Sequence, residues 1–229
     1  MENKPIIELD LYIIRHGESI GNVGYGRDNL TLKESQDPIL TEKGIAQARA
    51  AGEFLKETQF DAAYASPMLR AAKTAAEILG WQENKLSLNI MPELCEVGIN
   101  PEYKGVELDE ILSFYPGAVY ADGTQTSETR MRYDMHETPD KVNARAEFVV
   151  NYIRSRYKNG EKVMLVSHAA FITNLVFYIM KLHNTTIAFD IDYYNTGITR
   201  VTYYKPGTYK WGDTVFRYIN DTSHYSLIK

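Results

Sequence analysis

The most informative part of the chain is Leu11-Tyr12-Ile13-Ile14-Arg15-His16-Gly17-Glu18-Ser19-Ile20-Gly21-Asn22. Its apolar, β-branched beginning predicts a buried strand. The strand is followed at once by a cation, an imidazole and a glycine, which are poor material for a core. Because ligands of open α/β sheets bind at the carboxyl ends of the strands, we expect a ligand site at this position.

The residues after the predicted strand suit an anionic ligand. Arg15 carries a planar fork of donors that matches phosphate oxygens. His16 can act as a nucleophile through one ring nitrogen if a neighbour holds the other. Gly17 is expected to let the backbone turn sharply and approach a ligand closely. Ser19 and Asn22 add small polar groups one turn later.

A second apolar run ends in the same way. Val163 to Val166 predicts another buried strand, which stops on Ser167-His168-Ala169, and a helix is expected to follow through Ile179. We therefore expect His16 and His168 to lie on adjacent strands with their rings close together. An ordinary explanation for either histidine alone is a satisfied polar residue at a strand end.

An arginine is predicted at the same edge of the sheet. Phe60 to Ala65 predicts a short strand, after which Ser66 is a candidate N-cap and Pro67 suits the first helical position. This places Arg70 in the first turn of a helix that is expected to stop at Gly80. A solvated helix arginine is the alternative.

The remaining pattern completes an alternating α/β chain. Between about 97 and 136 the sequence is irregular and broken by glycine and proline, so we predict an insertion that forms a substrate-side cap rather than a second domain. Its cations could meet a second anionic group or be solvated; they are Lys104, Arg130 and Arg132. The other predicted elements are a helix capped by Thr41 and running to about Glu57, a short helix within Val106 to Phe114, a helix over Thr138 to about Lys158, and strands at Leu86 to Ile90, Ile198 to Tyr204 and Val215 to Tyr218.

These motifs together resemble the histidine phosphatase superfamily, whose members include phosphoglycerate mutases and small-molecule phosphatases. Arg15-His16-Gly17-Glu18-Ser19 followed by Asn22 is similar to its signature, and Ser66 to Ala75 is similar to its second arginine motif. Leu94-Cys95-Glu96 matches the family's Leu-x-Glu pattern. The resemblance covers nearly the whole chain, in the family's order. We therefore expect a single domain over residues 1 to 229, a three-layer α/β sandwich with a mostly parallel central sheet flanked by helices.

The resemblance also implies roles for the residues. His16 would be the nucleophile that forms a phosphohistidine, and Glu96 would be the acid for the leaving oxygen and then the base for water. The groups expected around the phosphoryl group are Arg15, Asn22, Arg70, His168 and Ala169. Bland alternatives are a surface carboxylate for Glu96 and a helix cap for Asn22, and Glu93 is a second candidate acid. Glu18 is expected to orient the loop, and Asn195-Thr196-Gly197 is similar to the family's late structural turn.

Two departures separate this chain from the mutases of the family. There the acid is followed by Arg-His-Tyr-Gly, whereas here Val97-Gly98-Ile99-Asn100 follows it. Mutases also place Gly-Asn after the second histidine, where this chain has Ala169-Ala170. We therefore expect a phosphatase acting on a small phosphate monoester, with a cofactor-dependent phosphoglycerate mutase or a non-catalytic phosphate-binding module as alternatives.

Charge, cysteine count and apolar runs limit the classes of ligand and the location that we expect for this protein. The 229-residue chain has a formal net charge of −5, which disfavours nucleic acid, and its one cysteine, Cys95, excludes an internal disulfide. The first residues lack the apolar run of a signal peptide, and the longest apolar stretch, Ala169 to Met180, is too short to span a membrane. A zinc site is disfavoured because two arginines would repel the cation. We expect a cytoplasmic enzyme without cofactor or metal, whose partner is a small phosphorylated substrate, with a homodimer left open.

Overall fold

A seven-stranded sheet forms the middle layer of the computed structural model, which describes residues 4–24, 30–100, 102–103, 105–124, 137–183 and 190–228. Its strand order is β4-β3-β2-β5-β1-β6-β7. The strands are β1 (Ile7–Arg15), β2 (Ala62–Ala65), β3 (Leu88–Ile90), β4 (Ala118–Tyr120), β5 (Glu161–Ser167), β6 (Ile198–Tyr204) and β7 (Thr214–Asp221).

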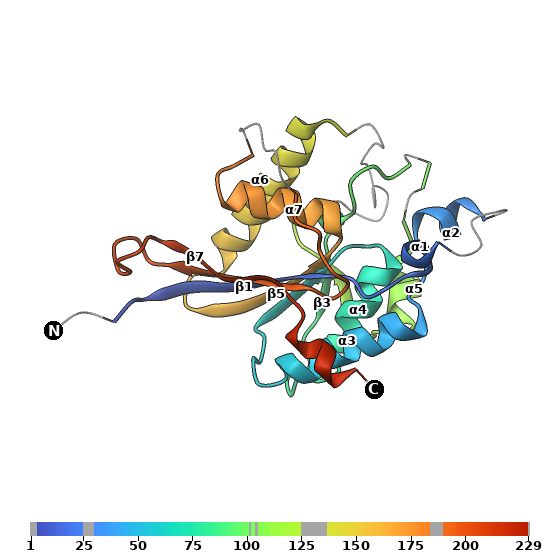
Figure 1. Ribbon diagram of the computed structural model, residues 1–229, viewed down its shortest axis with the longest axis horizontal. Helices are drawn as coiled ribbons and strands as arrows, with labels where there is room; N and C mark the ends of the chain where they lie inside the picture. The colour runs from blue at the N-terminus through green and yellow to red at the C-terminus, as the bar shows by residue number, and fades with distance from the viewer. Residues whose placement is uncertain are drawn as a thin grey trace.

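Helices cover both faces of this sheet (Figure 1). In Figure 1, α6 and α7 lie above the sheet, and α3 and α4 lie below it. The predicted three-layer α/β sandwich is confirmed. The helices are α1 (Ile20–Val23), α2 (Leu32–Gln36), α3 (Glu42–Leu55), α4 (Leu69–Leu79), α5 (Leu108–Leu112), α6 (Pro139–Arg156) and α7 (Ala169–Ile179), with 3-10 turns η1 (Pro92–Leu94) and η3 (Ser223–Leu227).

The register of the sheet brings the two histidine motifs together. Strands β1 and β5 are parallel neighbours, and Arg15 lies opposite Ser167. The residue that follows each of these is a histidine, so both histidines leave the sheet at the same edge. The pairs among β4, β3, β2, β5 and β1 are all parallel, whereas β6 and β7 add an antiparallel edge.

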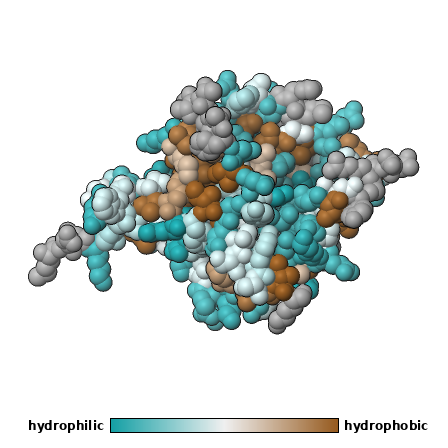
Figure 2. Space-filling view, in the orientation of Figure 1, coloured by the Kyte–Doolittle hydropathy of each residue, from teal (hydrophilic) through white to brown (hydrophobic). Residues whose placement is uncertain are grey.

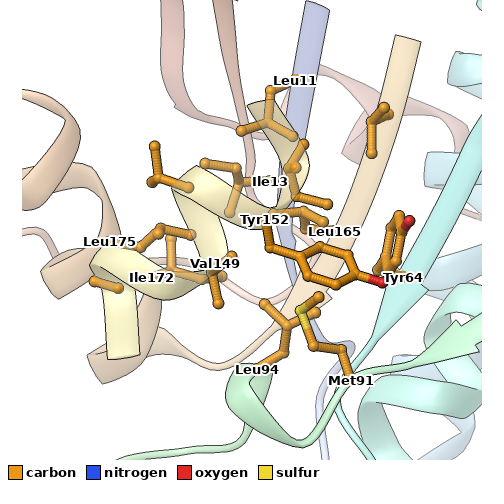
Figure 3. Close-up of a cluster of buried hydrophobic side chains, with 14 of the residues drawn as sticks. Leu11, Ile13, Tyr64, Met91, Leu94, Val149, Tyr152, Leu165, Ile172 and Leu175 are labelled. Atoms are coloured by element: carbon orange, nitrogen blue, oxygen red, sulfur yellow. The ribbon is translucent and has the colours of Figure 1, made fainter. Parts of the chain in front are cut away.

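Alternation along β1 explains the two cores. Leu11 and Ile13 pack toward α6 and α7, in the cluster of Figure 3, whereas Tyr12 and Ile14 pack toward α3 and α4. A strand buried on both faces needs apolar residues at every position, which is what Leu11 to Ile14 supply. The strand end that carries the site is therefore anchored from both sides.

The surface in the same view is mixed (Figure 2). Hydrophobic residues gather around α6 and α7, while hydrophilic residues cover much of the lower helical layer. Within the ranges that the structure describes, no helix combines the length and the apolar character needed to cross a membrane.

The helix starts test the predicted caps. The Thr41 hydroxyl accepts the Gly44 N–H at 3.0 Å, so this predicted N-cap is confirmed. The prediction for the next helix is wrong, because α4 begins at Leu69 with Met68 as its N-cap. The Ser66 hydroxyl instead lies within hydrogen-bond distance of the His168 ring. Gly80 does follow the last residue of α4, but in an ordinary right-handed conformation.

The segment predicted as an insertion contributes to the sheet. Ala118–Tyr120 forms the edge strand β4, parallel to β3, and Ile111 of α5 is buried in the same core cluster as residues of α4. The pattern of a three-residue strand is too short to be detected by alternation, which explains why it was not predicted. Lys104, Arg130 and Arg132 lie outside the described residues, and the cap function stays a prediction.

Candidate active site

His16 stands at the centre of the site, directly after β1. Its backbone N–H donates to the Ser167 carbonyl at 2.9 Å, and its side chain is buried, with 3% of its surface exposed. Nδ1 lies 2.7 Å from the Gly17 carbonyl, and Arg70 Nε donates to Nε2 at 3.2 Å. Because the guanidinium can only donate, Nε2 is the acceptor and the proton is on Nδ1. Nε2 therefore carries the lone pair that a nucleophile needs.

Burial and cations keep this imidazole neutral. Burial, followed by the charges of Arg70 and Arg15, holds the pKa of His16 well below its usual value of 6.5. A protonated ring would have no lone pair, so the lowered pKa favours a nucleophile over a charged donor.

Gly17 is required by close packing against the start of α3. A Cβ at Gly17 would lie 2.4 Å from the Gly44 carbonyl oxygen, and a Cβ at Gly44 would lie 2.0 Å from the Glu18 carbonyl oxygen. The loop after His16 thus lies directly on the first turn of α3. Glycine at position 17 is therefore explained by the close approach of two backbone segments, and the expected approach to a ligand stays a prediction.

Arg70 is held by a residue that the sequence analysis missed. Its Nη1 donates to Asp37 Oδ1 and to the Gln36 carbonyl, both at 3.1 Å. The Asp37 carboxylate also accepts from the Leu69 N–H at 2.7 Å and from the Tyr103 hydroxyl at 3.0 Å. Burial raises the pKa of Asp37, and the nearby Arg70 opposes that effect. A single acid in a polar loop gives no sequence signal for this role.

His168, at the end of β5, faces the first histidine. The two ring centroids are 5.1 Å apart, which confirms the predicted proximity. His168 Nε2 lies 2.9 Å from Ser66 Oγ, which accepts the Met68 N–H at 3.2 Å. Within the described residues, the Ser66 hydroxyl proton has no acceptor besides this nitrogen, so Nε2 accepts and Nδ1 carries the proton. Burial and the charge of Arg70 hold the pKa of His168 well below its usual value.

Arg15 projects from the last position of β1 toward the same edge. Its Nη1 donates to the Tyr193 carbonyl, and its buried Nε bonds to no described group. His168 Nδ1 is likewise buried without a partner among the described residues. Two buried donors near the His16 imidazole without a partner among the described residues require explanation, and an anionic ligand would satisfy both.

Glu96 lies in the loop after η1, next to the first turn of α7. Its Oε1 accepts the Val97 N–H at 2.9 Å and the Phe171 N–H at 3.1 Å. A carboxylate at a helix N-terminus is favourable, so this tether ties Glu96 to the helix that begins after His168. Both hydrogen bonds use Oε1, which leaves Oε2 as the oxygen able to exchange a proton. The alternative acid, Glu93, is buried within η1, and 7% of its surface is exposed.

The other predicted site residues are held less directly. Asn22 is exposed, and its Oδ1 accepts from the Ser19 N–H at 3.0 Å and from Asn195 Nδ2 at 3.2 Å. Ala169 is the first residue of α7. Glu18 accepts from Thr41 and Lys43, as expected for a residue that orients the loop.

Three further residues form hydrogen bonds to the backbone of the loop from His16 to Glu18. The Thr74 hydroxyl accepts the Gly17 N–H at 3.0 Å, and Gln47 Oε1 accepts the Glu18 N–H at 2.8 Å. Asn195 Nδ2 donates to the His16 carbonyl at 3.2 Å. The late turn that contains Asn195 is therefore part of the support of the site, as its structural interpretation implied.

This set of donors around His16 Nε2 is chemically suited to bind and transfer a phosphoryl group, because such transfer depends mainly on positioning and charge stabilisation. The comparison with protein families agrees. A family model described as the histidine phosphatase superfamily, branch 1, matches residues 11–213, and the chain belongs to this family.

Curated relatives carry the names of mutases. The chain is 31% identical over 181 residues to a 2,3-bisphosphoglycerate-dependent phosphoglycerate mutase of Methylobacterium radiotolerans, covering 74% of this chain and 78% of that enzyme. It is 43% identical over 108 residues to the enzyme of that name from Bartonella henselae, covering 46% of this chain and 50% of the enzyme.

Solved structures with the same fold include both activities. A phosphoserine phosphatase mutant from Entamoeba histolytica, in complex with phosphoserine, matches with a TM-score of 0.58 and 23% identity, over 94% of this chain and 98% of that one. A phosphoglycerate mutase from Bacillus anthracis matches with a TM-score of 0.60 and 22% identity, over 99% and 98%. At these identities the likeness concerns the fold.

Proposed function

We propose that this protein is a phosphatase that hydrolyses a small-molecule phosphate monoester through a phosphohistidine on His16. The observation that carries the proposal is the geometry of that residue, a buried neutral imidazole with its proton on Nδ1 and Nε2 turned toward Arg70. Arg15, Arg70 and His168 supply the donors for the three phosphoryl oxygens.

The first step transfers the phosphoryl group to the enzyme. Arg70 Nε occupies the lone pair of His16 Nε2 before substrate binds. Binding must therefore move this N–H to a phosphoryl oxygen. The lone pair of Nε2 then attacks phosphorus while the bond to the leaving oxygen breaks, and Glu96 gives that oxygen a proton.

The second step releases inorganic phosphate. Water attacks the phosphorus, the Nε2–P bond breaks, and Glu96, now a carboxylate, takes the proton from the water. The enzyme returns to its starting state, with no metal required by this sequence of steps.

The residues around the acid favour hydrolysis over mutase activity. Val97 packs against the core, and Ile99 is buried with Met68, Cys95 and Tyr103. This stretch therefore gives no cation to the second anionic group of a phosphoglycerate. The names of the curated relatives support the mutase as the second candidate.

The test measures product identity. The protein is incubated with 4-nitrophenyl phosphate, with and without a chelator, and separately with 3-phosphoglycerate plus 2,3-bisphosphoglycerate, with the His16→Asn variant as control. We expect release of nitrophenol that depends on His16, and inorganic phosphate without 2-phosphoglycerate. Conversion of 3-phosphoglycerate into 2-phosphoglycerate would establish the mutase. Silence on both substrates and on a panel of phosphorylated metabolites would favour a binding module, and loss only with chelator would indicate a metal.

A further inference from the structure

We infer that Arg145 is a positioning residue for the acid. This residue of α6 holds the turn that carries Glu96 against the first turn of α7. The inference rests on the proposed function, in which Glu96 is the acid.

The guanidinium binds the backbone on the acid's own loop. Arg145 Nη1 donates to the Cys95 carbonyl at 2.6 Å and to the Glu93 carbonyl at 3.1 Å. Cys95 directly precedes Glu96, so the peptide that leads into the acid is fixed by a charged donor. Arg145 is itself buried, with 4% of its surface exposed.

A second contact sets the plane of the guanidinium. Arg145 Nε and Nη2 donate to the two carboxylate oxygens of Glu137, at 2.9 and 2.6 Å. Both side chains are 2% exposed. Such a bidentate pair fixes the orientation of the fork, whereas a buried ion pair is weak evidence for added stability. The Arg145–Glu137 pair is better explained by the way it orients the guanidinium toward the backbone carbonyls of the loop that carries Glu96.

The same group also contacts the partner of the acid. The Arg145 guanidinium lies 4.2 Å from the ring centroid of Phe171, whose backbone N–H donates to Glu96 Oε1. Arg145 thus contacts the peptide that precedes the acid and the ring of the residue whose N–H tethers it. The turn has a further anchor, because Ser167 Oγ donates to the Leu94 carbonyl at 2.6 Å and Leu94 is buried in the core (Figure 3).

Lysine cannot reproduce this arrangement. An ammonium is a compact charge without a planar fork, so it can pair with Glu137 but cannot also fix both carbonyls and lie on the ring. Arg145→Lys therefore keeps the charge and removes the positioning. The Arg200 side chain offers a matched control, because it binds the Asp10 carboxylate and lies 5.1 Å from the Tyr12 ring centroid, without contact to the acid loop.

The experiment compares kcat/KM for an alkyl phosphate, such as a glycerol phosphate, and for 4-nitrophenyl phosphate. The alkyl leaving group needs a well-placed acid, whereas the nitrophenolate does not. We expect Arg145→Lys to lower the alkyl value about tenfold more than the aryl value, a fraction of the usual worth of general acid catalysis. Arg200→Lys should leave the ratio unchanged. In a Glu96→Gln background, Arg145→Lys should no longer shift the ratio.

The outcomes separate the two claims. If Glu96→Gln shifts the ratio but Arg145→Lys, folded by circular dichroism, does not, the positioning role is wrong and the acid stands. If Glu96→Gln itself leaves the ratio unchanged, Glu96 is not the acid, and the proposed function loses that residue. If Arg145→Lys does not fold, Glu137→Gln decides, since it frees the fork while keeping the arginine. A ratio unchanged in Glu137→Gln would then overturn the inference.

Discussion

The two histidines of the site occupy equivalent places, each directly after one of two paired parallel strands. The hydrogen bonds give both the same tautomer, with the proton on Nδ1. They differ in the nitrogen that is held. His16 uses Nδ1 to bind the Gly17 carbonyl and presents Nε2, whereas His168 uses Nε2 to bind Ser66 and presents Nδ1–H. One ring therefore offers a lone pair and the other offers a donor.

This difference shows that the strand ends determine where the two imidazole rings lie, whereas their hydrogen-bond partners determine the chemical role of each ring. Both rings are buried and both have lowered pKa values. Neither electrostatics nor place in the sheet separates a nucleophile from a donor here. The two roles are separated by the hydrogen-bond partner of each ring. The Gly17 carbonyl holds Nδ1 of His16, and the Ser66 hydroxyl holds Nε2 of His168.

The largest expected effect distinguishes the two rings directly. His16→Asn should abolish turnover and leave no acid-labile phosphoryl group on the protein, because no nucleophile remains. His168→Asn should lower kcat by about 10² to 10³, the usual cost of one donor to a developing charge, while still allowing the phosphoenzyme to form. Acid quench with radiolabelled substrate measures both. A phosphoenzyme in His16→Asn would transfer the nucleophilic role elsewhere.

A smaller effect is expected from the support of Arg70. Asp37→Asn removes the carboxylate that orients the guanidinium, so we expect kcat/KM to fall about tenfold or more, as for loss of a hydrogen-bonded charged pair. Tyr103→Phe is the matched control, since it removes one bond to the same carboxylate and leaves the charge. Equal losses in the two variants would show that the charge of Asp37 is unimportant to Arg70.

The sequence predicted the parts of the site that follow from local pattern. Strands ending on Arg15-His16 and on Ser167-His168 are visible as apolar runs, and their adjacency follows from parallel sheet topology. The supports could not be predicted in this way. Asp37 meets Arg70 and Arg145 meets the Cys95 carbonyl across long separations in the chain, and no local periodicity records such pairs. The sequence around Ser66 fits a helix cap, whereas its hydroxyl in fact bonds to His168.

The Ser66 hydroxyl sets the tautomer of one ring and not of the other. We expect Ser66→Ala to lower kcat by roughly tenfold, the worth of about one hydrogen bond, by freeing His168 Nε2. Nitrogen NMR of the histidine rings should show protonated Nδ1 for both residues in the wild type. The variant should alter the His168 resonances and leave those of His16 unchanged. A change in the His16 resonances as well would show that the tautomers of the two rings are coupled rather than determined independently.

The last expected effect is on stability rather than on turnover, and it concerns a third buried histidine, which lies outside the catalytic pair. Thr196 Oγ1 donates to the Asn195 carbonyl at 2.7 Å, so His224 Nε2, at 2.8 Å from that oxygen, is the donor to it. Burial lowers the pKa of His224 to about 4. Between this value and about 6.5 in the unfolded chain, the unfolded state binds more protons, so the free energy of unfolding falls as pH falls through that window.

His224→Gln keeps an N–H donor and removes this titration. The wild type should lose up to about 3 kcal/mol more than the variant between pH 7 and pH 4, the shift of His224 converted at 1.36 kcal/mol per unit. Urea unfolding at pH 7, 6, 5 and 4 measures the two curves. A slope that persists in the variant over this window comes from other groups with lowered pKa values, among them His16, His168 and the carboxylate of Glu18. Parallel curves would assign the whole pH dependence to other groups and leave His224 as a neutral part of the support behind the His16 loop.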